Sequence, residues 1–247
     1  MKMSEYTRGE WKKMKDQPLK VRLAYFWDYY KWPTIVAVLL VIALAYTVTV
    51  RLNQKEAVLS GILINSSMPL EDPAFLQEFC QETGVDTKKQ ELSLLIGLSL
   101  EADNPSVGIM TYQRIHAGVA AQDTDFLIAT ADAFRQCAYD TSNMMMDLRE
   151  FLSPEQLEQL EGRLYYIDAS LFEKISNGEV VEYPSPYAPQ KMEQPIAVGI
   201  NIRDCEEFLD SYYYTDDPVY FAVICNTPHP DRTLQFFEFI MEEINKE

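Results

Sequence analysis

The pattern of apolar and polar positions divides the chain into one long apolar run and a series of short periodic segments. The run from Pro33 to Val50 contains no charged residue, no amide and no glycine. As a helix, these eighteen residues would span about 27 Å, close to the hydrocarbon thickness of a bilayer. A surface helix of a soluble protein has one polar face, whereas every face of this run is apolar. We therefore predict a single transmembrane helix at residues 33–50.

The residues before this run predict its orientation. Residues 1–32 carry eight Lys or Arg and four acidic residues, and six aromatic residues lie between Tyr25 and Trp32. Tyr and Trp favour the headgroup region of a bilayer, and basic residues favour its cytoplasmic side. The lipid bilayer is thus the first expected partner, through residues 33–50. The expected organisation is a cytoplasmic basic and aromatic tail at 1–32, the transmembrane helix at 33–50, a linker at 51–56 and an extracytoplasmic domain at 57–247.

A cleaved signal peptide is the alternative interpretation of the apolar run. Ala43-Leu44-Ala45 fits the pattern of small residues that precedes a cleavage site. However, the polar region before the run is about thirty residues long, and the run continues past Ala45 to Val50. A retained signal-anchor is therefore preferred, with the large domain outside the cell membrane.

Residues 57–247 alternate between strand and helix patterns. Strands are expected at 57–64, 90–100, 125–129, 164–167, 196–202 and 219–225. Helices are expected from Asp72-Pro73 to Glu82, from Asn104 to about Ala121, from Ala131, from Ser153-Pro154 and over 230–247. This alternation predicts a three-layer α/β domain with a mixed, mostly parallel sheet.

Two local sequences add detail to this pattern. Ser153, Pro154 and Gln156 have the spacing of a helix cap, because the serine side chain can bond the backbone of the first turn. The proline-rich stretch 183–189 cannot join a central strand, so we expect it to run as an extended connector.

Charge and composition exclude several classes of function. Residues 56–247 contain 34 acidic and 11 basic residues, a net charge of −23, which would repel nucleic acid. The four cysteines are far apart in sequence, and three lie in apolar segments, so free thiols are favoured over disulfides. Only two histidines are present, and the sequence contains no metal-binding spacing, no phosphate-binding glycine loop and no nucleophile motif. We expect no cofactor, no metal site and no catalytic residues.

Several segments resemble extracellular solute-binding proteins. They are residues 125–138 with 147–153, residues 195–201, and residues 219–231. The segment from Asp28 to Pro33 is similar to the region before the membrane anchor in proteins of Gram-positive clostridia. The resemblance implies a periplasmic-binding-protein-like lobe of type II. The family has two complete lobes, whereas about 190 residues provide one lobe and a fragment, which implies that the ligand cleft is missing or shallow.

Ligands of open α/β sheets bind at the carboxyl ends of the strands, beside helix N-termini. In this chain those positions hold short polar side chains, which also serve as ordinary turn and cap residues. The candidate ligand-binding residues are Ser66, Ser67, Thr130, Asp132, Asn226 and Thr227. A second group, Tyr212 to Tyr214 with Asp216 and Asp217, could form an aromatic surface for sugars or cations, or simply pack.

These observations predict a membrane-anchored recognition protein that binds a small solute or a partner at the cell surface. The alternative is an interaction protein whose lobe has no ligand and docks on another membrane protein. The two roles predict different surfaces. A binding protein should have a concave polar pocket with aromatic walls, and a docking protein should have a flat apolar patch.

Overall fold

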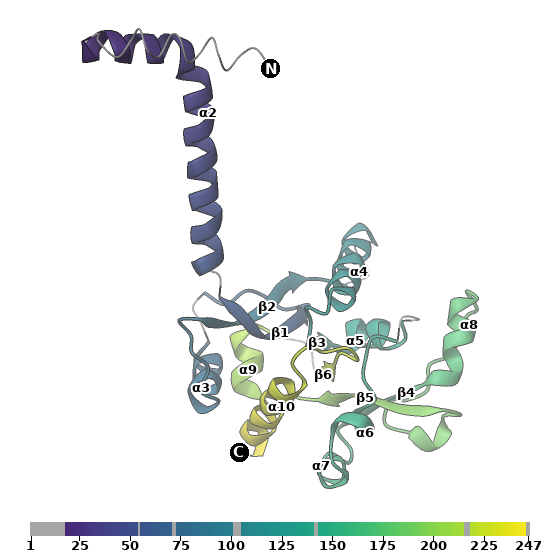
Figure 1. The fold of residues 1–247 in the computed structure, drawn as a ribbon. Coiled ribbons are helices and arrows are strands. Elements are labelled where there is room, and N and C mark those ends of the chain that lie inside the picture. The colour runs from purple at the N-terminus through teal and green to yellow at the C-terminus, as the bar shows by residue number, and fades with distance from the viewer. Residues whose placement is uncertain are drawn as a thin grey trace. The chain divides into compact units, whose positions relative to one another are not determined.

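The fold is described here from a computed structural model of residues 18–53, 55–70, 73–100, 105–140, 143–214 and 218–245 (Figure 1). The chain divides into two compact units, Met1–Gln54 and Lys55–Glu247. Several residues named above lie outside the described ranges. These are residues 1–17 of the basic tail, Asp72, Asn104, Asp216 and Asp217.

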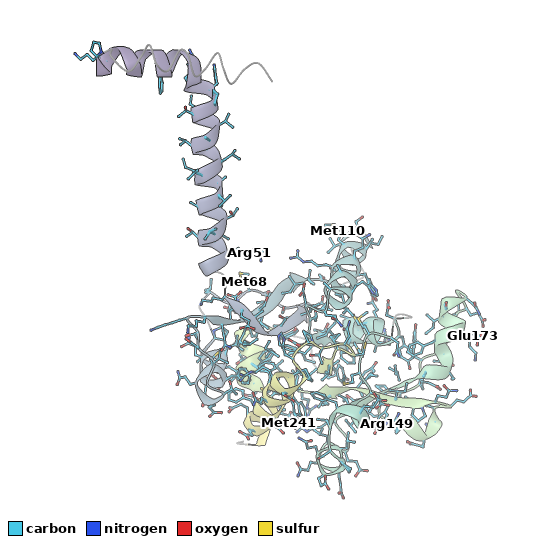
Figure 2. The ribbon with its side chains drawn as sticks, in the orientation of Figure 1. Arg51, Met68, Met110, Arg149, Glu173 and Met241 are labelled. Carbon is cyan, nitrogen blue, oxygen red and sulfur yellow. The ribbon has the colours of Figure 1, made fainter. Side chains whose placement is uncertain are left out.

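The first unit is dominated by one long helix, α2 (Leu19–Asn53), which contains the expected transmembrane segment and has Pro33 in its interior. Its stretch Lys31–Arg51 has a mean hydropathy of 2.3, and no part of it is buried by the rest of the protein. The apolar side chains of this stretch extend freely around the helix in Figure 2. The N-terminal apolar helix is thus confirmed, and it is long and apolar enough to cross a bilayer.

The second unit is built on one six-stranded sheet with the order β2-β1-β3-β6-β5-β4. Strands β1, β2, β3 and β5 run in one direction, and β4 and β6 run in the other. We call the side where β1, β2, β3 and β5 finish the carboxyl end of the sheet, and the opposite side its amino end. The strands are β1 (Glu56–Ile64), β2 (Gln90–Leu98), β3 (Phe126–Thr130), β4 (Leu164–Asp168), β5 (Pro195–Asn201) and β6 (Val219–Val223).

All six expected strands are confirmed, and the sheet is mixed as expected. The pairings differ from a mostly parallel sheet, because β1 pairs in parallel with β2 and β3 whereas the other three pairings are antiparallel. The reason is that β6 enters the middle of the sheet from the carboxyl end and runs against both of its neighbours.

Helices cover both faces of the sheet, which gives the three layers expected from the sequence (Figure 1). One face is covered by α3 (Ala74–Glu82), α6 (Leu148–Phe151), α7 (Pro154–Gln159), α9 (Glu206–Ser211) and α10 (Pro230–Asn245). The other face is covered by α4 (Pro105–Ala120), α5 (Ala131–Ala138) and α8 (Phe172–Ser176). Two short 3₁₀ turns, η1 (Ala169–Leu171) and η2 (Pro189–Lys191), complete the chain order.

Local sequence explains where several of these helices begin. At α7 the Ser153 hydroxyl accepts the Gln156 N–H, and the Gln156 side chain accepts the Ser153 N–H, so the predicted capping box is confirmed. The short helices α8 and α9 were not predicted, because five or six residues carry too little periodicity to distinguish a helix from a turn.

Phenylalanines fill the core beneath the centre of the sheet. Phe126 on β3 stacks on Phe221 of β6 and on Phe236 of α10, with ring centroids 5.4 and 4.9 Å apart. Gly61 on β1 makes this possible, because a Cβ atom there would lie 2.1 Å from the Phe126 ring. Burial of such rings is the main source of stability in a domain of this size.

The two outer strands of the sheet differ in what lies beside them. Beyond β4, the proline-rich connector follows the strand, and the Tyr166 N–H donates to the Pro186 carbonyl over 3.0 Å. The Asp168 carboxylate at the end of β4 accepts the N–H groups of Ser170, Glu193 and Gln194 at 2.8–3.1 Å. Beyond β2, no described strand is paired.

Candidate functional site

Four of the six candidate residues lie at the carboxyl end of the sheet, and most of them already have protein partners. Thr130 is buried, and its hydroxyl accepts the side-chain N–H of Asn65 at 2.9 Å. The Ser66 hydroxyl donates to the Leu63 carbonyl, and the Ser67 N–H donates to the Tyr212 carbonyl. The role of these residues in ligand binding stays a prediction, but their contacts are those of turn residues.

Asp132 differs from the other three because it is on the surface. Its carboxylate lies 2.8 Å from Arg135 one turn later on α5, and its side chain is 80% exposed. An exposed pair of this kind contributes little to stability, so both charges remain available to a ligand.

Asn226 and Thr227 lie at the amino end of the sheet, because β6 runs antiparallel to β3. Five residues of β3 separate the two ends, roughly 16 Å at the usual rise of a strand. The six candidates are therefore divided between two places and cannot surround one small ligand. The Asn226 side-chain N–H donates to the Val119 carbonyl at 2.7 Å, and the Thr227 hydroxyl donates to Asp125 at 2.5 Å.

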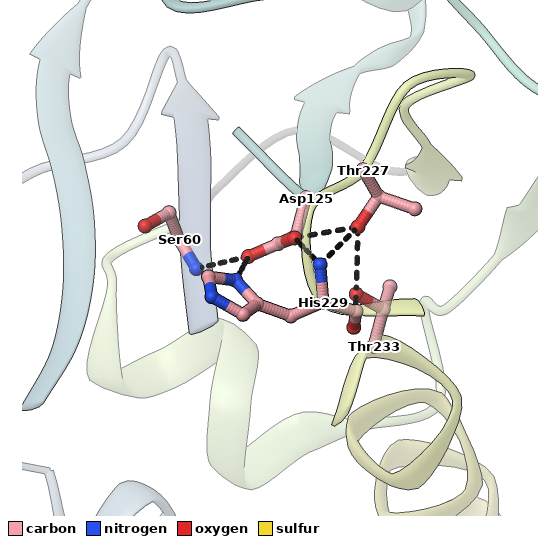
Figure 3. Close-up of polar contacts among 5 residues, drawn as sticks. All are labelled: Ser60, Asp125, Thr227, His229 and Thr233. Atoms are coloured by element: carbon pink, nitrogen blue, oxygen red, sulfur yellow. Dashed lines mark hydrogen bonds and ion pairs between the residues drawn. The ribbon is translucent and has the colours of Figure 1, made fainter. Parts of the chain in front are cut away.

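Asp125 is the centre of a polar cluster at the amino end of the sheet (Figure 3). It has no exposed surface, and its Oδ2 accepts the Ser60 N–H of β1 at 2.7 Å. Its Oδ1 accepts the Thr227 hydroxyl and the His229 N–H, and its Oδ2 lies 3.1 Å from Nδ1 of the His229 ring. The Thr233 hydroxyl in turn donates to the His229 carbonyl at the start of α10. One carboxylate therefore joins β1, β3 and the β6–α10 loop.

The chemistry of this cluster favours a structural role. An imidazole held by a buried carboxylate is also the orientation of a general base. Here, however, both threonine hydroxyls donate to protein oxygens, and among the described residues no side chain hydrogen-bonds to Nε2 of His229. Four donors surround the carboxylate, which is the condition for burying such a charge.

A pocket with aromatic walls lies on the other helical layer, between α4, α5, α8 and the connector. Its volume is about 620 Å³, within the range of small-molecule sites. We call it the tyrosine pocket. It is lined by Tyr112, Arg135, Gln136, Tyr139, Asp140, Ile175, Ser176 and Tyr183.

The walls of the tyrosine pocket are held together by ring contacts. The rings of Tyr139 and Tyr183 are 4.6 Å apart between centroids, and the Arg135 guanidinium lies 5.8 Å above the Tyr183 ring. On α4, the Tyr112 ring stacks on His116, whose Nε2 lies 3.3 Å from the Asp140 carboxylate. The pocket therefore combines apolar ring faces with one guanidinium and one carboxylate.

Burial keeps the hydroxyls of Tyr112 and Tyr139 protonated. Desolvation raises the pKa of Tyr112 well above its ordinary value, and the nearby Cys137 and Asp140 add to this effect. Desolvation also raises the pKa of Tyr139, partly offset by the Asp168 N–H that its hydroxyl accepts. Both phenols therefore remain neutral hydrogen-bonding groups at physiological pH.

Other hollows on the surface fit a ligand less well. The space between α7 and α10 has a volume of about 710 Å³, but its wall consists mainly of Gln, Glu and Arg side chains. Leu160, Phe237 and Met241 supply its apolar part, so it has one aromatic ring where the tyrosine pocket has three.

The tyrosines 212–214 mostly pack rather than form a binding surface. Tyr212 and Tyr214 are buried, and the Tyr214 hydroxyl donates to the Ile128 carbonyl, whereas Tyr213 is 51% exposed. All four cysteines are free thiols, as expected, and burial raises the pKa of Cys137 to about 12. That thiol is consequently unreactive at neutral pH.

Sequence reasoning missed both the Asp125 cluster and the tyrosine pocket. Asp125 and His229 are 104 positions apart, and the pocket takes its walls from residues 112 to 183. One signal was available in the sequence, because Asp125 comes directly before a fully buried strand. A carboxylate in such a place needs hydrogen-bond donors from other parts of the protein.

Comparison with known proteins adds no relative to this description. No family model, no curated protein and no solved structure matches the chain. Within the described ranges, no group of three or more His, Cys, Asp or Glu is placed to hold a metal ion.

Proposed function

We propose that this chain is a membrane-anchored recognition protein that binds a small polar ligand in the tyrosine pocket. In this proposal residues 33–50 cross the cell membrane, the N-terminus is cytoplasmic, and Lys55–Glu247 forms an extracytoplasmic receptor unit. The similarity to solute-binding lobes is part of the same proposal.

The tyrosine pocket is the observation that carries the proposal. It has the size and the mixture of ring faces and polar groups that ligand sites use, and three tyrosines supply the apolar part. The guanidinium of Arg135 and the carboxylate of Asp140 would orient a ligand that carries charge or hydrogen-bonding groups.

The anchor is supported by the composition of α2 and by the charges before it. A 21-residue apolar stretch without burial is unfavourable in water, and the excess of Lys and Arg in residues 1–32 favours a cytoplasmic N-terminus. Protease added to intact cells should remove the large unit and leave a short membrane-bound fragment. Protection of the large unit in intact cells, with cleavage after lysis, would contradict this orientation.

Ligand binding can be tested by thermal unfolding of the full chain in detergent with sugars, amino acids and short peptides. A ligand at one hundred times its dissociation constant stabilises the folded state by about 2.7 kcal/mol, which raises the melting temperature by a few degrees. Tyr183→Ala should abolish that rise because it removes one wall of the pocket. Tyr213→Ala, an exposed tyrosine outside the pocket, serves as the control.

The result of this screen shows whether the protein binds a ligand and whether the tyrosine pocket is the binding site. A ligand whose effect is lost in Tyr183→Ala and kept in Tyr213→Ala supports the pocket. A ligand that stabilises all three proteins equally binds elsewhere, and no response from any compound argues against solute capture.

An interaction role is the second candidate, because large apolar side chains outside the pocket are exposed. Two segments that follow β1 and β2 at the carboxyl end of the sheet expose large apolar side chains. They are Met68, Leu70, Val107, Ile109 and Met110, and Leu70 is 94% exposed. Met110 lies on the outer end of α4 (Figure 2). Exposed apolar groups of this kind mark protein–protein contact sites when they are contiguous.

The two candidates can be separated by substitution on this surface. Ile109→Ser together with Met110→Ser should leave ligand-induced stabilisation unchanged, because neither residue lines the pocket. If the docking role is correct, the same double variant should lose a membrane-protein partner that cross-linking captures with the wild type.

A further inference from the structure

β2 is an outer strand that lacks the usual protection of a sheet edge over its first part, whereas its register with β1 shifts between Leu95 and Leu98, where Gly97 has a φ of 79°. Its inner side pairs in parallel with β1, and among the described residues no strand pairs with its outer side. Natural proteins usually protect such a strand with charges, proline, a bulge or a covering segment, because unpaired backbone groups attract another strand.

The sequence of β2 makes this edge unusually apolar. From Leu92 to Leu100 the chain contains no charged residue and no proline. Leu92, Leu94 and Ile96 are only half-buried, and all three pack against the core layer that contains α3. The outer strand therefore offers both a free backbone and a row of incompletely covered side chains.

A groove runs beside the first half of this strand. It has a volume of about 430 Å³ and lies between α3 and β2, where Leu76, Cys80, Val85 and Leu92 form its apolar wall. Side chains of an added strand that point to the same face as Leu92 would enter this groove.

Charge limits which surfaces of two copies can meet. Residues 56–247 carry a net charge of −23, so most of their surfaces repel each other. β2 beyond Glu91 and the whole of α4 contain no acidic residue, and α4 adds Arg114. Contact at this surface avoids the repulsion that the rest of the domain imposes.

We propose that β2 pairs antiparallel with β2 of a second copy of this chain, so that two sheets join into one across a two-fold axis. Pairing of the stretch Leu92–Ile96, which precedes Gly97, places Leu94 on the axis, opposite Leu94 of the second copy. Leu92 then lies opposite Ile96 of the second copy on the same face, which gives a self-complementary apolar row. The two Glu91 residues are six positions apart along the strand, roughly 20 Å, and are screened by salt.

This geometry can be tested with the full chain in detergent by native mass spectrometry. The wild type should have the mass of a dimer, twice 28.5 kDa. Leu94→Lys and Leu94→Glu should each be monomeric, because two like charges would face each other on the axis. An equal mixture of the two variants should form the Lys–Glu heterodimer, which an unfolded protein could not do.

Leu157→Lys is the matched control, because Leu157 is also a partly buried leucine of the same core layer but lies on α7. It should remain a dimer. A monomeric wild type would overturn the proposal. A dimer that persists in both Leu94 variants would also overturn it, because association would then use another surface. The proposal does not rest on ligand binding, so failure of the thermal screen leaves it intact.

Discussion

The two outer strands of the sheet show two different ways to end a sheet. At β4 the backbone is covered by the connector, and the Asp168 carboxylate holds three N–H groups from segments before and after that connector. At β2 the described structure has a long apolar strand and an adjacent groove, without a covering segment. One edge is covered within the chain, and at the other, among the described residues, no strand pairs with the outer side, which is where we propose that a second copy binds.

The difference shows that protection of an edge depends on where the connections of the fold pass. The chain between β4 and β5 is long and proline-rich, so it can lie along β4 without forming a strand of its own. The connections before and after β2 lead through α3 and α4, which lie over the faces of the sheet. Within the described ranges, neither connection lies along the outer side of β2 as a paired strand.

The largest loss of stability is expected for the Asp125 cluster, at the amino end of the middle strands. The losses at the two outer strands can be compared with it. Asp125→Ala removes the acceptor of four donors in a fully buried place, so the free energy of unfolding should fall by about 3–5 kcal/mol. Urea denaturation would measure it. Asp132→Ala, which removes an exposed carboxylate, should cost less than about 1 kcal/mol. Similar losses for both would contradict the central role of Asp125.

At the covered edge, Asp168→Ala should cost about 2–3 kcal/mol, because the N–H groups of Ser170, Glu193 and Gln194 lose their acceptor. The connector should also become cleavable by protease between Gly178 and Gln194 before the sheet unfolds. If protease cleaves the connector only when the whole sheet unfolds, the connector is as stable as the core. In that case β4 does not behave as an edge strand.

The covered edge should also depend on pH. Desolvation raises the pKa of Asp168, but hydrogen bonds from Glu193, Ser170 and Gln194 outweigh it and hold the pKa below its ordinary value. The stabilisation is therefore complete above the ordinary pKa near 4 and is lost as the pH falls through the lower folded value. The difference in unfolding free energy between wild type and Asp168→Asn should shrink below about pH 4. A constant difference down to pH 2 would contradict this linkage.

The smallest effect on stability is expected at the open edge. Ser93→Lys places a charge on an exposed position of β2 and should change the unfolding free energy by less than about 0.5 kcal/mol. It should nevertheless reduce association strongly, because a lysine on an outer strand blocks added strands. Sedimentation velocity over a range of protein concentrations would measure the proportions of monomer and dimer. An unchanged association state would indicate that β2 is not the contact.

The sequence predicted the strands well and their directions less well. Each strand was confirmed to within two residues at either end, because alternation and burial are local properties of the chain. The antiparallel direction of β6 depends on how the long segment before it returns to the sheet, which no local pattern records. Asn226 and Thr227 were consequently placed with Thr130, although they lie at the opposite end of the sheet.

The sites were less predictable than the fold for a similar reason. The partners of Asp125 come from β1 and from the β6–α10 loop, and their meeting depends on strand order. The tyrosine pocket requires α4 and α5 to lie beside a connector that the sequence predicted to be extended but did not place in the fold. Tyrosines spaced tens of residues apart give no periodic signal, so only the assembled layers bring them together.

The position of β6 has a consequence for how the molecule is made. Of the six described strands β6 comes last along the chain, yet it lies between β3 and β5 in the middle of the sheet. During synthesis the ribosome therefore releases the parallel group β1, β2 and β3 first and the antiparallel pair β4 and β5 later, and these two groups share no ladder. The sheet becomes continuous only after Val219–Val223 has emerged, so the two groups of strands must wait for β6 before they can join.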